Sequence, residues 1–496
     1  MKLPLQSVPC SAEPENDAFS VGTAMFGGRF RIERKLGLGA MGAVYAAFDA
    51  ARGESVALKT LHHMNSSAIY AIKDEFRSLC DVVHPNIVSL HELFADAPHW
   101  FFTMDLVAGT DFMSFLSSRR QQRSVDGADD LHFLRLGFRQ LVAGIDAIHA
   151  AGMLHLDLKP SNVLVTDDAR VVVLDFGLCR ATSTGARDEL LGTPAYMAPE
   201  QAAGREVSEA TDWYALGVVL FEALTGRLPF DGSAARIVAD KILKVAPRAS
   251  SIAERVPADL DELCQCLLAR EPEDRPSARD IRATLEMPAV DGQRTSLAPR
   301  NVSKPPFVGR RQELSQLRDC YSEAALGQVV LAVVAAPSGM GKSALIAHFI
   351  ASMPLAETPL VLSGRCFERE SVPYNGVDSV IDELGIQLRR LSDVDVSALL
   401  QSDPSDLLRA FPVLRGIPAI VRHCLQTDET VDVKAAKRNA VRSLREILAG
   451  LSQRRTVLIF IDDLHWADSD TTRLLLDSGG TAAPGARSGG RWLPQR

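Results

Sequence analysis

The first regular pattern in the chain is an alternation of hydrophobic and polar residues that begins at Phe30. Phe30 and Ile32 alternate with charged residues, and after a glycine-bearing turn the segment AVYAAFD follows. This pattern predicts two strands joined by a glycine-rich turn. Residues 1–28 are polar, contain proline and show no period, so we expect a disordered leader there.

Hydrophobic residues then recur at helical spacing. In SAIYAIKDEFRSL they lie three and four residues apart, and the segment from Leu134 to Ile148 repeats that spacing. Both segments are typical of amphipathic helices. The segment DWYALGVVLFEALTG is almost wholly apolar, begins at Asp212 and ends at Gly226. An acidic start and a glycine stop predict a buried central helix.

A second series of strand and helix patterns follows a polar linker. Residues 288–305 are rich in Pro, Ser and polar residues, which indicates a linker. The segment QVVLAVVAAPSGMGKSALIAHFI then reads as a strand, a turn of small residues and a helix, and RRTVLIFIDD reads as another buried strand. Residues 479–496 are rich in Gly, Ala, Arg and Pro without a period, so we expect a disordered tail.

Composition narrows the class of protein. A chain of 496 residues is too long for one core and fits two to three domains. With 46% hydrophobic and 23% charged residues it is typical of a soluble protein, and its net charge of −8 argues against a partner such as nucleic acid or an anionic membrane surface. No run of about 18 apolar residues predicts a membrane span, and the N-terminus is a poor secretory signal. We therefore expect a cytoplasmic protein.

The segment HLDLKPSN carries the first candidate chemistry. It places Asp157, Lys159 and Asn162 within six residues, and Asp175 follows at the end of the apolar strand VVVLD. Phosphoryl transfer needs residues that hold phosphates and metal and that orient a hydroxyl. Asp157 can orient a hydroxyl and accept its proton. Asn162 and Asp175 supply oxygen ligands that suit Mg²⁺.

The glycines at 37, 39 and 42 form a G-x-G-x-x-G turn, whose backbone amides can close over phosphates. That pattern alone also fits an ordinary hairpin or a dinucleotide fold, but a strand rather than a helix follows it here. Lys59 ends the next strand, where a cation would hold the α and β phosphates. Glu75 lies on or beside the buried helix stripe, so we expect it to pair with Lys59; the alternative is a surface glutamate.

Nine motifs in series resemble the eukaryotic-type Ser/Thr protein kinase family over about residues 30–287. They are GLGAMGAV, VALK, the helix glutamate, HPNIVSL, HLDLKPSN, DFG, GTPAYMAPE, DWYALG and EPEDRPSA. The resemblance implies an α+β two-lobed kinase fold over residues 29–287, with ATP in the cleft and proteins as substrates. The positions that it assigns to ATP are Leu36, Gly37, Gly39, Gly42, Val44, Ala57, Lys59, Glu75, Met104, Asp105, Val107 and Leu164.

The resemblance also implies several finer roles. Lys159 and the GTPAY segment indicate Ser/Thr rather than Tyr specificity, with Thr193 bordering the acceptor pocket. Asp212 would brace the backbone of the catalytic loop. One position departs from the family, because Leu156 stands where most relatives have arginine before the catalytic aspartate. That arginine normally pairs with a phosphate on the activation loop. We therefore expect the activity to depend weakly, if at all, on loop phosphorylation.

A catalytically inactive scaffold is the competing interpretation of the same domain. The positions that phosphoryl transfer requires are all filled, which favours an enzyme. They are Lys59, Glu75, Asp157, Asn162 and Asp175.

The segment GMGKS lies between an apolar strand and a helix, as a phosphate-binding loop requires. Lys342 would reach phosphate and Ser343 would ligate Mg²⁺, with Gly339 and Gly341 in the turn. Asp462, at the end of the later strand, would hold the metal's water. Ala336 replaces the usual first glycine, which weakens the match.

These motifs resemble the AAA-type signalling NTPase module that is often fused behind bacterial Ser/Thr kinases. The resemblance covers about residues 306–478 and implies an α/β P-loop domain that looks incomplete, so we expect weak nucleotide binding and poor hydrolysis. A Ser/Thr kinase of bacterial signal transduction that uses ATP and Mg²⁺ is the expected function. The alternative is a nucleotide-gated switch or scaffold in which the NTPase module is the sensor.

Overall fold

The computed structural model describes residues 19–38, 42–61, 65–96, 99–121, 128–175, 180–181, 193–286, 309–337, 340–353, 359–424, 433–479 and 489–494. These residues form two compact units. The first contains residues 1–64, 79–245 and 270–273, and the second contains residues 65–78, 246–269 and 274–496. The predicted linker at 288–305 lies outside the described residues, as do positions 39 and 339.

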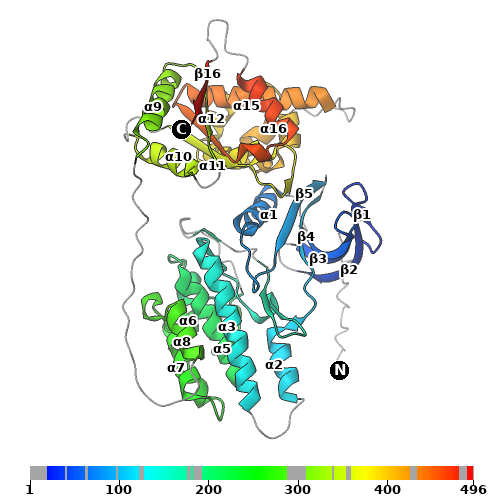
Figure 1. Ribbon diagram of the computed structural model, residues 1–496, viewed down its shortest axis with the longest axis vertical. Coiled ribbons are helices and arrows are strands. Elements are labelled where there is room, and N and C mark those ends of the chain that lie inside the picture. The colour runs from blue at the N-terminus through cyan, green and yellow to red at the C-terminus, as the bar shows by residue number, and fades with distance from the viewer. Residues whose placement is uncertain are drawn as a thin grey trace, which may run out of the picture. The chain divides into compact units, whose positions relative to one another are not determined.

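The first unit begins with an antiparallel sheet in the order β1-β2-β3-β4-β6-β5, whose strands are drawn in blue in Figure 1. The predicted strand pair on either side of the glycine-rich turn is confirmed as β2 and β3. The strands are β1 (Ala24–Met25), β2 (Phe30–Leu38), β3 (Gly42–Asp49), β4 (Glu54–Leu61), β5 (Leu90–Asp96) and β6 (His99–Asp105).

Alternate residues of these strands build an aromatic core on one face of the sheet. Phe30, Phe94 and Phe101 are fully buried, and the rings of Phe94 and Phe101 stack with their centroids 5.0 Å apart. Phe19 packs edge-on against Tyr45 at 5.6 Å. The structure therefore differs from the expected leader over its last ten residues, because Phe19 is buried in this core.

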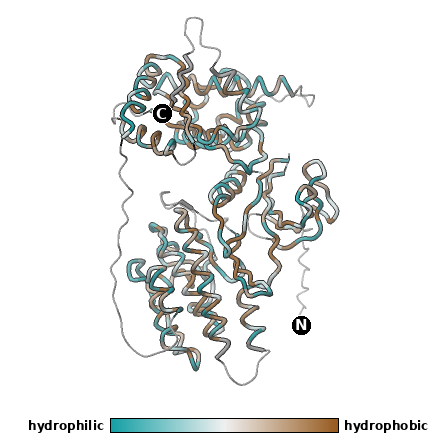
Figure 2. The backbone as a smooth tube through the Cα atoms, in the orientation of Figure 1, coloured by the Kyte–Doolittle hydropathy of each residue, from teal (hydrophilic) through white to brown (hydrophobic). Residues whose placement is uncertain are grey.

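The rest of the first unit is mainly helical. Its elements are β7 (Thr110–Asp111), α2 (Phe112–Gln121), α3 (Ala128–Ala150), β8 (Met153–Leu154), β9 (Val163–Val165), β10 (Val171–Val173), β11 (Arg180–Ala181), α4 (Pro199–Ala202), α5 (Glu209–Thr225) and α6 (Ala234–Leu243). Nearly every residue of α5 from Thr211 to Ala223 is buried, and Gly226 ends the helix in the left-handed conformation. The predicted buried central helix is confirmed, and hydrophobic positions colour much of its length in Figure 2.

The second unit includes helix α1 (Ser66–Leu79) as far as Ser78, although this helix lies between β4 and β5 in the sequence. The other helices are α7 (Ala258–Leu267), α8 (Ala278–Glu286), α9 (Arg311–Ala325), α10 (Lys342–Ala351), α11 (Asn375–Arg389), α12 (Asp393–Leu399), α13 (Ser405–Ala410), α14 (Pro418–Arg422), α15 (Val433–Ser452) and α16 (Ser469–Gly479). The strands are β12 (Val330–Ala335), β13 (Leu360–Arg365), β14 (Glu370–Ser371), β15 (Val457–Asp462) and β16 (Gly489–Pro494).

Strand β15 separates two hydrophobic clusters of this unit. Leu458 and Phe460 pack against the cluster built by α9 and α10, whereas Val457 and Ile461 pack against the larger cluster around α11. Successive side chains of a strand point to opposite faces. A strand that is covered by helices on both faces, as β15 is, therefore needs an uninterrupted run of apolar residues.

Two pairs of parallel strands form in this unit, β12 with β16 and β13 with β15. Strand β16 was not predicted. Gly489–Pro494 forms β16 beside Val330–Ala335, where the sequence predicts a disordered tail. The segment GGRWLP is too short and too rich in glycine to show a strand period, so only its pairing with β12 reveals the strand. No helix among the described residues has both the length and the apolarity to cross a bilayer.

A buried lysine anchors the segment that precedes α4. Lys241 of α6 is 1% exposed, and its Nζ donates to the carbonyl oxygens of Ala195 and Met197 at 2.7 Å each. The same Nζ lies 5.2 Å from the ring centre of Tyr214. Burial lowers the pKa of Lys241 from 10.5 to about 7, because a charged ammonium loses its water there.

This pKa predicts a pH-dependent stability. Between about pH 7 and pH 10.5 the unfolded chain holds a proton on Lys241 that the folded chain has released, so the free energy of unfolding rises with pH. We expect the free energy of unfolding of the wild type, measured by thermal denaturation, to rise across this window relative to that of Lys241→Met, by at most about 1.4 kcal/mol per pH unit. Lys244→Met, which changes an exposed lysine next to the same helix, should behave as the wild type. Equal pH slopes in all three proteins would contradict the prediction.

Candidate active site

One buried carboxylate holds the loop between β8 and β9. Asp212, in the first turn of α5, is 0% exposed. Its oxygens accept the backbone N–H groups of His155 and Leu156, each at 2.8 Å, and its Oδ2 lies 2.7 Å from Nε2 of His149. Burial favours a raised pKa for Asp212, but the hydrogen bond from His149 and these other contacts hold it below its usual range. The bracing role implied for Asp212 is confirmed.

Leu156 lies in the left-handed backbone region, with φ of 63°. A non-glycine residue adopts this conformation only where its surroundings fix it. Asp212 binds its N–H, and Nε2 of Gln201 donates to its carbonyl oxygen at 3.0 Å. The leucine side chain is 9% exposed. The weak dependence on loop phosphorylation stays a prediction, because residues 182–192 lie outside the described residues.

Asp157 is the centre of a polar cluster. Its Oδ2 accepts from Nζ of Lys159 at 2.6 Å, and its Oδ1 accepts from both the backbone N–H and the hydroxyl of Thr193 at 3.1 Å. Lys159 also donates to the Thr193 hydroxyl at 3.0 Å. Asn162 donates to the backbone oxygen of Asp157 at 2.9 Å. The structure therefore brings together the residues that the HLDLKPSN motif predicts, and Thr193, which the resemblance places beside them, contacts two of them.

A second charged pair joins Lys59 of β4 to Asp175, which lies two residues after β10. Nζ of Lys59 lies 2.6 Å from Oδ1 of Asp175, and the two side chains are 11% and 45% exposed. Burial favours a raised pKa for Asp175, but the Lys59 ammonium, with weaker help from His155 and Lys159, keeps it below its usual range. Asp175 is therefore a carboxylate at neutral pH. The predicted pairing of Lys59 with Glu75 stays a prediction, because Glu75 belongs to the second unit.

Strand register places the predicted nucleotide contacts on one face of the sheet. Val44 pairs with Lys59, Ala57 pairs with Met104, and residues opposite each other in a ladder share a face. The pairing of Ala46 with Ala57 gives the same result, because Val44 and Ala46 are two residues apart. An apolar surface bordered by the Lys59 ammonium is suited to an adenine ring and its phosphates.

The remaining predicted contacts lie on or close to strands β6 and β9. Asp105 ends β6 and its Oδ1 lies 2.8 Å from Nε2 of His91, and half-buried Val107 follows it. Leu164 is half-buried on β9, opposite Val172 of β10. Their binding of ATP stays a prediction.

The glycine-rich turn is described only at its edges. Leu36 and Gly37 lie exposed at the end of β2, and Gly39 lies outside the described residues. Gly42 begins β3, where a Cβ would lie 1.6 Å from the carbonyl oxygen of Thr60. No other residue fits at that distance, so this glycine allows β3 and β4 to approach each other.

The side chains of Asn162 and Asp175 fit the metal that the chemistry requires. Asn162 uses its Nδ2 to bind Asp157, which leaves its amide oxygen as a possible ligand, and Asp175 has a second oxygen besides the one that Lys59 binds. The backbone N–H of Leu174 donates to the carbonyl oxygen of Asn162 at 2.8 Å, so the two side chains lie on adjoining segments. Proteins commonly bind Mg²⁺ through only one or two side-chain oxygen ligands, because the ion keeps several of its water ligands.

The second unit contains the predicted phosphate-binding loop. Gly341, in the left-handed conformation at φ of 77°, precedes α10, which begins at Lys342. Nζ of Lys342 donates to the backbone oxygens of Ala336 at 3.1 Å and Pro337 at 3.3 Å. The hydroxyl of Ser343 donates to the carboxylate of Asp462. Gly339 lies outside the described residues.

Sequence reasoning missed two residues that fix the site, His149 and Gln201. His149 lies in the last turn of α3 and binds Asp212, 63 positions away, and Gln201 binds Leu156, 45 positions away. Neither residue belongs to a motif that the sequence analysis used. Only the fold brings such partners together.

Comparisons with known proteins agree with this geometry. The profile of the protein kinase domain matches residues 30–285, and that of the AAA ATPase domain matches residues 306–479. The chain is 32% identical to the serine/threonine-protein kinase PknL of Mycobacterium tuberculosis, over 57% of this chain and 72% of that protein. It is 34% identical to the serine/threonine-protein kinase Pkn1 of Myxococcus xanthus, over 54% of this chain and 39% of the relative. It is 33% identical to the serine/threonine-protein kinase PknA of M. tuberculosis, over 57% of this chain and 65% of that protein.

Proposed function

Because the chain belongs to the protein kinase family, we propose that it transfers the γ-phosphoryl group of ATP to serine and threonine hydroxyls of proteins, in bacterial signal transduction. The expected α+β kinase fold, followed by a domain of the P-loop ATPase type, is confirmed. The observation that carries the proposal is the cluster in which Asp157 faces both Lys159 and Thr193.

The described contacts support a role for each residue. In our proposal the Asp157 carboxylate orients the substrate hydroxyl and takes its proton as the oxygen attacks the γ-phosphorus. The Lys159 ammonium, already 2.6 Å from Asp157, offsets the negative charge of the phosphoryl group in transfer. Thr193 borders the hydroxyl position through its contacts with both side chains. The bond from the γ-phosphorus to the bridging oxygen breaks, and ADP leaves with that electron pair.

Lys59 would hold the α and β phosphates of ATP. Val44, Ala57 and Met104 line the face of the sheet next to it, which supports an adenine site there. Asn162 and Asp175 would hold Mg²⁺, whose charge would neutralise phosphate oxygens. Leu36, Gly37, Gly39, Gly42, Glu75, Asp105, Val107 and Leu164 complete the proposed ATP site.

We also propose the domain limits as 29–287 for the kinase and 306–478 for the NTPase-type part. The family matches support these limits closely. A cytoplasmic setting is the corresponding proposal for the compartment, because ATP is supplied there and thiols stay reduced.

A second candidate function is a nucleotide-gated switch in which the C-terminal part is the sensor. It rests on the contact of Ser343 with Asp462, which joins the phosphate-binding loop to β15. Next to this contact, Nε of Arg365 donates to Asp463 at 3.0 Å. The side chain of Asn375, the first residue of α11, binds the backbone of Trp466 and of Asp468. The proposed nucleotide site is therefore joined through short contacts to a helix that packs into the core of the unit.

Replacement of the catalytic carboxylate tests the kinase proposal. Asp157→Asn keeps the shape of the side chain but removes the proton acceptor, so we expect the rate of phosphate transfer from ATP to a generic protein acceptor to fall by about 10²- to 10⁴-fold. Asp167→Asn, at an exposed position, is the matched control and should keep the wild-type rate. Equal rates in the wild type and Asp157→Asn would refute the proposed catalytic site.

A titration with a non-hydrolysable ATP analogue and Mg²⁺ tests the second candidate. We expect two analogue molecules to bind per wild-type chain, and one to bind to either Lys59→Ala or Lys342→Ala, because each lysine belongs to a separate proposed site. If the wild type binds one molecule and Lys342→Ala leaves that binding unchanged, the sensor function is ruled out.

A further inference from the structure

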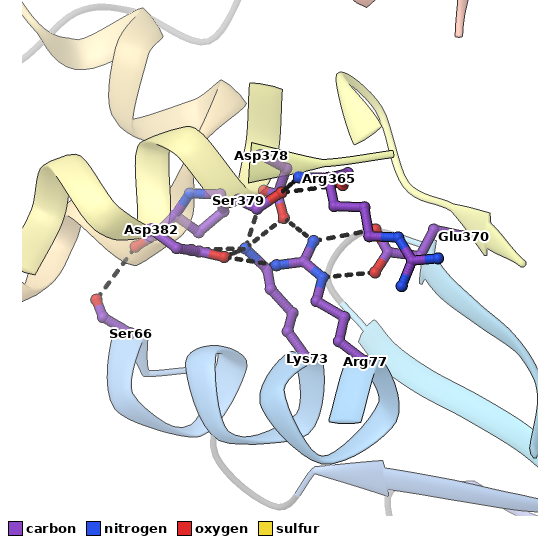
Figure 3. Close-up of polar contacts among 9 residues, drawn as sticks. Ser66, Lys73, Arg77, Arg365, Glu370, Asp378, Ser379 and Asp382 are labelled. Carbon is purple, nitrogen blue, oxygen red and sulfur yellow. Dashed lines mark hydrogen bonds and ion pairs between the residues drawn. The ribbon is translucent and has the colours of Figure 1, made fainter. Parts of the chain in front are cut away.

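Two cations of α1 are buried in a cluster of three carboxylates of the C-terminal part of the chain. Nζ of Lys73 lies 2.7 Å from Asp378 and 3.0 Å from Asp382. The guanidinium of Arg77 contacts Glu370 at 2.5 Å, Asp378 at 2.7 Å and Asp382 at 2.8 Å. Figure 3 shows Lys73 and Arg77 pointing together from α1 into the gap lined by these carboxylates. We call these five residues the charge cluster.

The spacing of the residues explains how the two helices match. Lys73 and Arg77 are four positions apart on α1, and Asp378 and Asp382 are four positions apart on α11, so each pair lies on one face of its helix. The Lys73 side chain is 2% exposed, and the three carboxylate side chains are between 0% and 7% exposed. Buried charges need partners in this way, whereas a surface ion pair would stay hydrated.

Contacts other than ion pairs extend the same surface along α1. The hydroxyl of Ser66 donates to the backbone oxygen of Pro412 at 3.1 Å. Tyr70 packs against the hydrophobic cluster around α11, and the Arg77 guanidinium lies 5.6 Å from the ring centre of Phe367. Contacts therefore run from the first turn of the helix to the last, which is more than one chance ion pair would give.

The same helix carries a residue that the kinase proposal needs. Glu75 lies midway between Lys73 and Arg77 and is 4% exposed. A helix of 14 residues is only marginally stable by itself and depends on packing for its order. Whatever fixes α1 therefore also fixes the position of Glu75.

We propose that Glu370, Asp378 and Asp382 form a docking surface for the basic face of α1 in the same chain, and that this docking anchors α1 for kinase activity. The proposal rests on the proposed kinase function, and it gives the C-terminal part a regulatory role that does not require nucleotide hydrolysis. Removal of the docking surface loosens α1 and lowers the rate of phosphate transfer. Its partner is defined by chemistry, as a helix with two cations one turn apart.

Charge reversal and its compensation test the docking in the full-length chain. The first variant is Lys73→Glu with Arg77→Glu, the second is Asp378→Lys with Asp382→Lys, and the third combines all four substitutions. Two readouts are used: hydrogen exchange of the backbone amides of α1, and the rate of phosphate transfer. Arg236→Glu with Lys244→Glu, which reverses two exposed cations at α6, is the matched control and should match the wild type.

We expect both double variants to exchange the α1 amides faster and to lose about 5- to 150-fold in rate, the usual range for coupling between sites. The fourfold variant should recover part of the protection and of the rate, because it restores opposite charges between positions 73 and 77 and positions 378 and 382, while Glu370 alone faces a like charge at position 77. An equimolar mixture of the two double variants should stay slow, since docking occurs within one chain.

Three results would overturn the proposal. Unchanged exchange in the double variants would show that α1 is not docked, and faster exchange without loss of rate would show that docking does not serve the kinase. A rate restored by mixing the two double variants would replace docking within one chain by docking between copies. If the wild type transfers no phosphate, the kinase function fails, but the exchange measurement still decides the docking.

Discussion

The kinase site depends on the hydrogen bonds that the buried Asp212 carboxylate accepts. Asp212 binds two consecutive backbone N–H groups, those of His155 and Leu156, and the ring of His149. These bonds hold Leu156 in a left-handed conformation that a leucine rarely adopts. The next residue is Asp157, so its carboxylate projects from a backbone whose direction Asp212 has set. Asp212 can stay charged in the dry interior because several hydrogen-bond donors stabilise its carboxylate.

A second set of buried charges lies within the second compact unit. Helix α1 lies within the kinase match, yet it belongs to the same compact unit as α11. Lys73 and Arg77 are matched by three carboxylates, and removing either side would leave charges buried without partners. The boundaries of the compact units therefore do not coincide with the limits of the two family matches. The helix that carries Glu75 is grouped with the C-terminal part of the chain.

Local patterns predicted much of the fold and of the kinase site. Phe30 and Ile32 marked a strand, the apolar run after Asp212 marked a buried helix, and HLDLKPSN placed Asp157, Lys159 and Asn162 together. In each case the information lies within a few residues, where periodicity and motif spacing apply. Resemblance to the family added the role of Asp212, which spacing alone does not give.

Long-range partners were not predictable in the same way. Lys73 and Asp378 are 305 positions apart, and a lysine beside a hydrophobic stripe gives no sign of its partner. Lys241 reads as an ordinary surface lysine of an amphipathic helix, although it is buried beneath Ala195 and Met197. The strand at Gly489–Pro494 exists only through its pairing with β12. Tertiary packing decides all three, and the local sequence does not contain it.

Thermal unfolding of Asp212→Asn tests the central claim most directly, because this variant keeps the size of the side chain but replaces one acceptor oxygen with a donor. Glu209→Gln, an exposed change in the first turn of the same helix, is the comparison. Asp212→Asn should lose about 1–3 kcal/mol of stability for each backbone N–H left unsatisfied, and should lose phosphate transfer with it, while Glu209→Gln keeps both. A variant at Asp212 that unfolds at the wild-type temperature and keeps its activity would contradict the account.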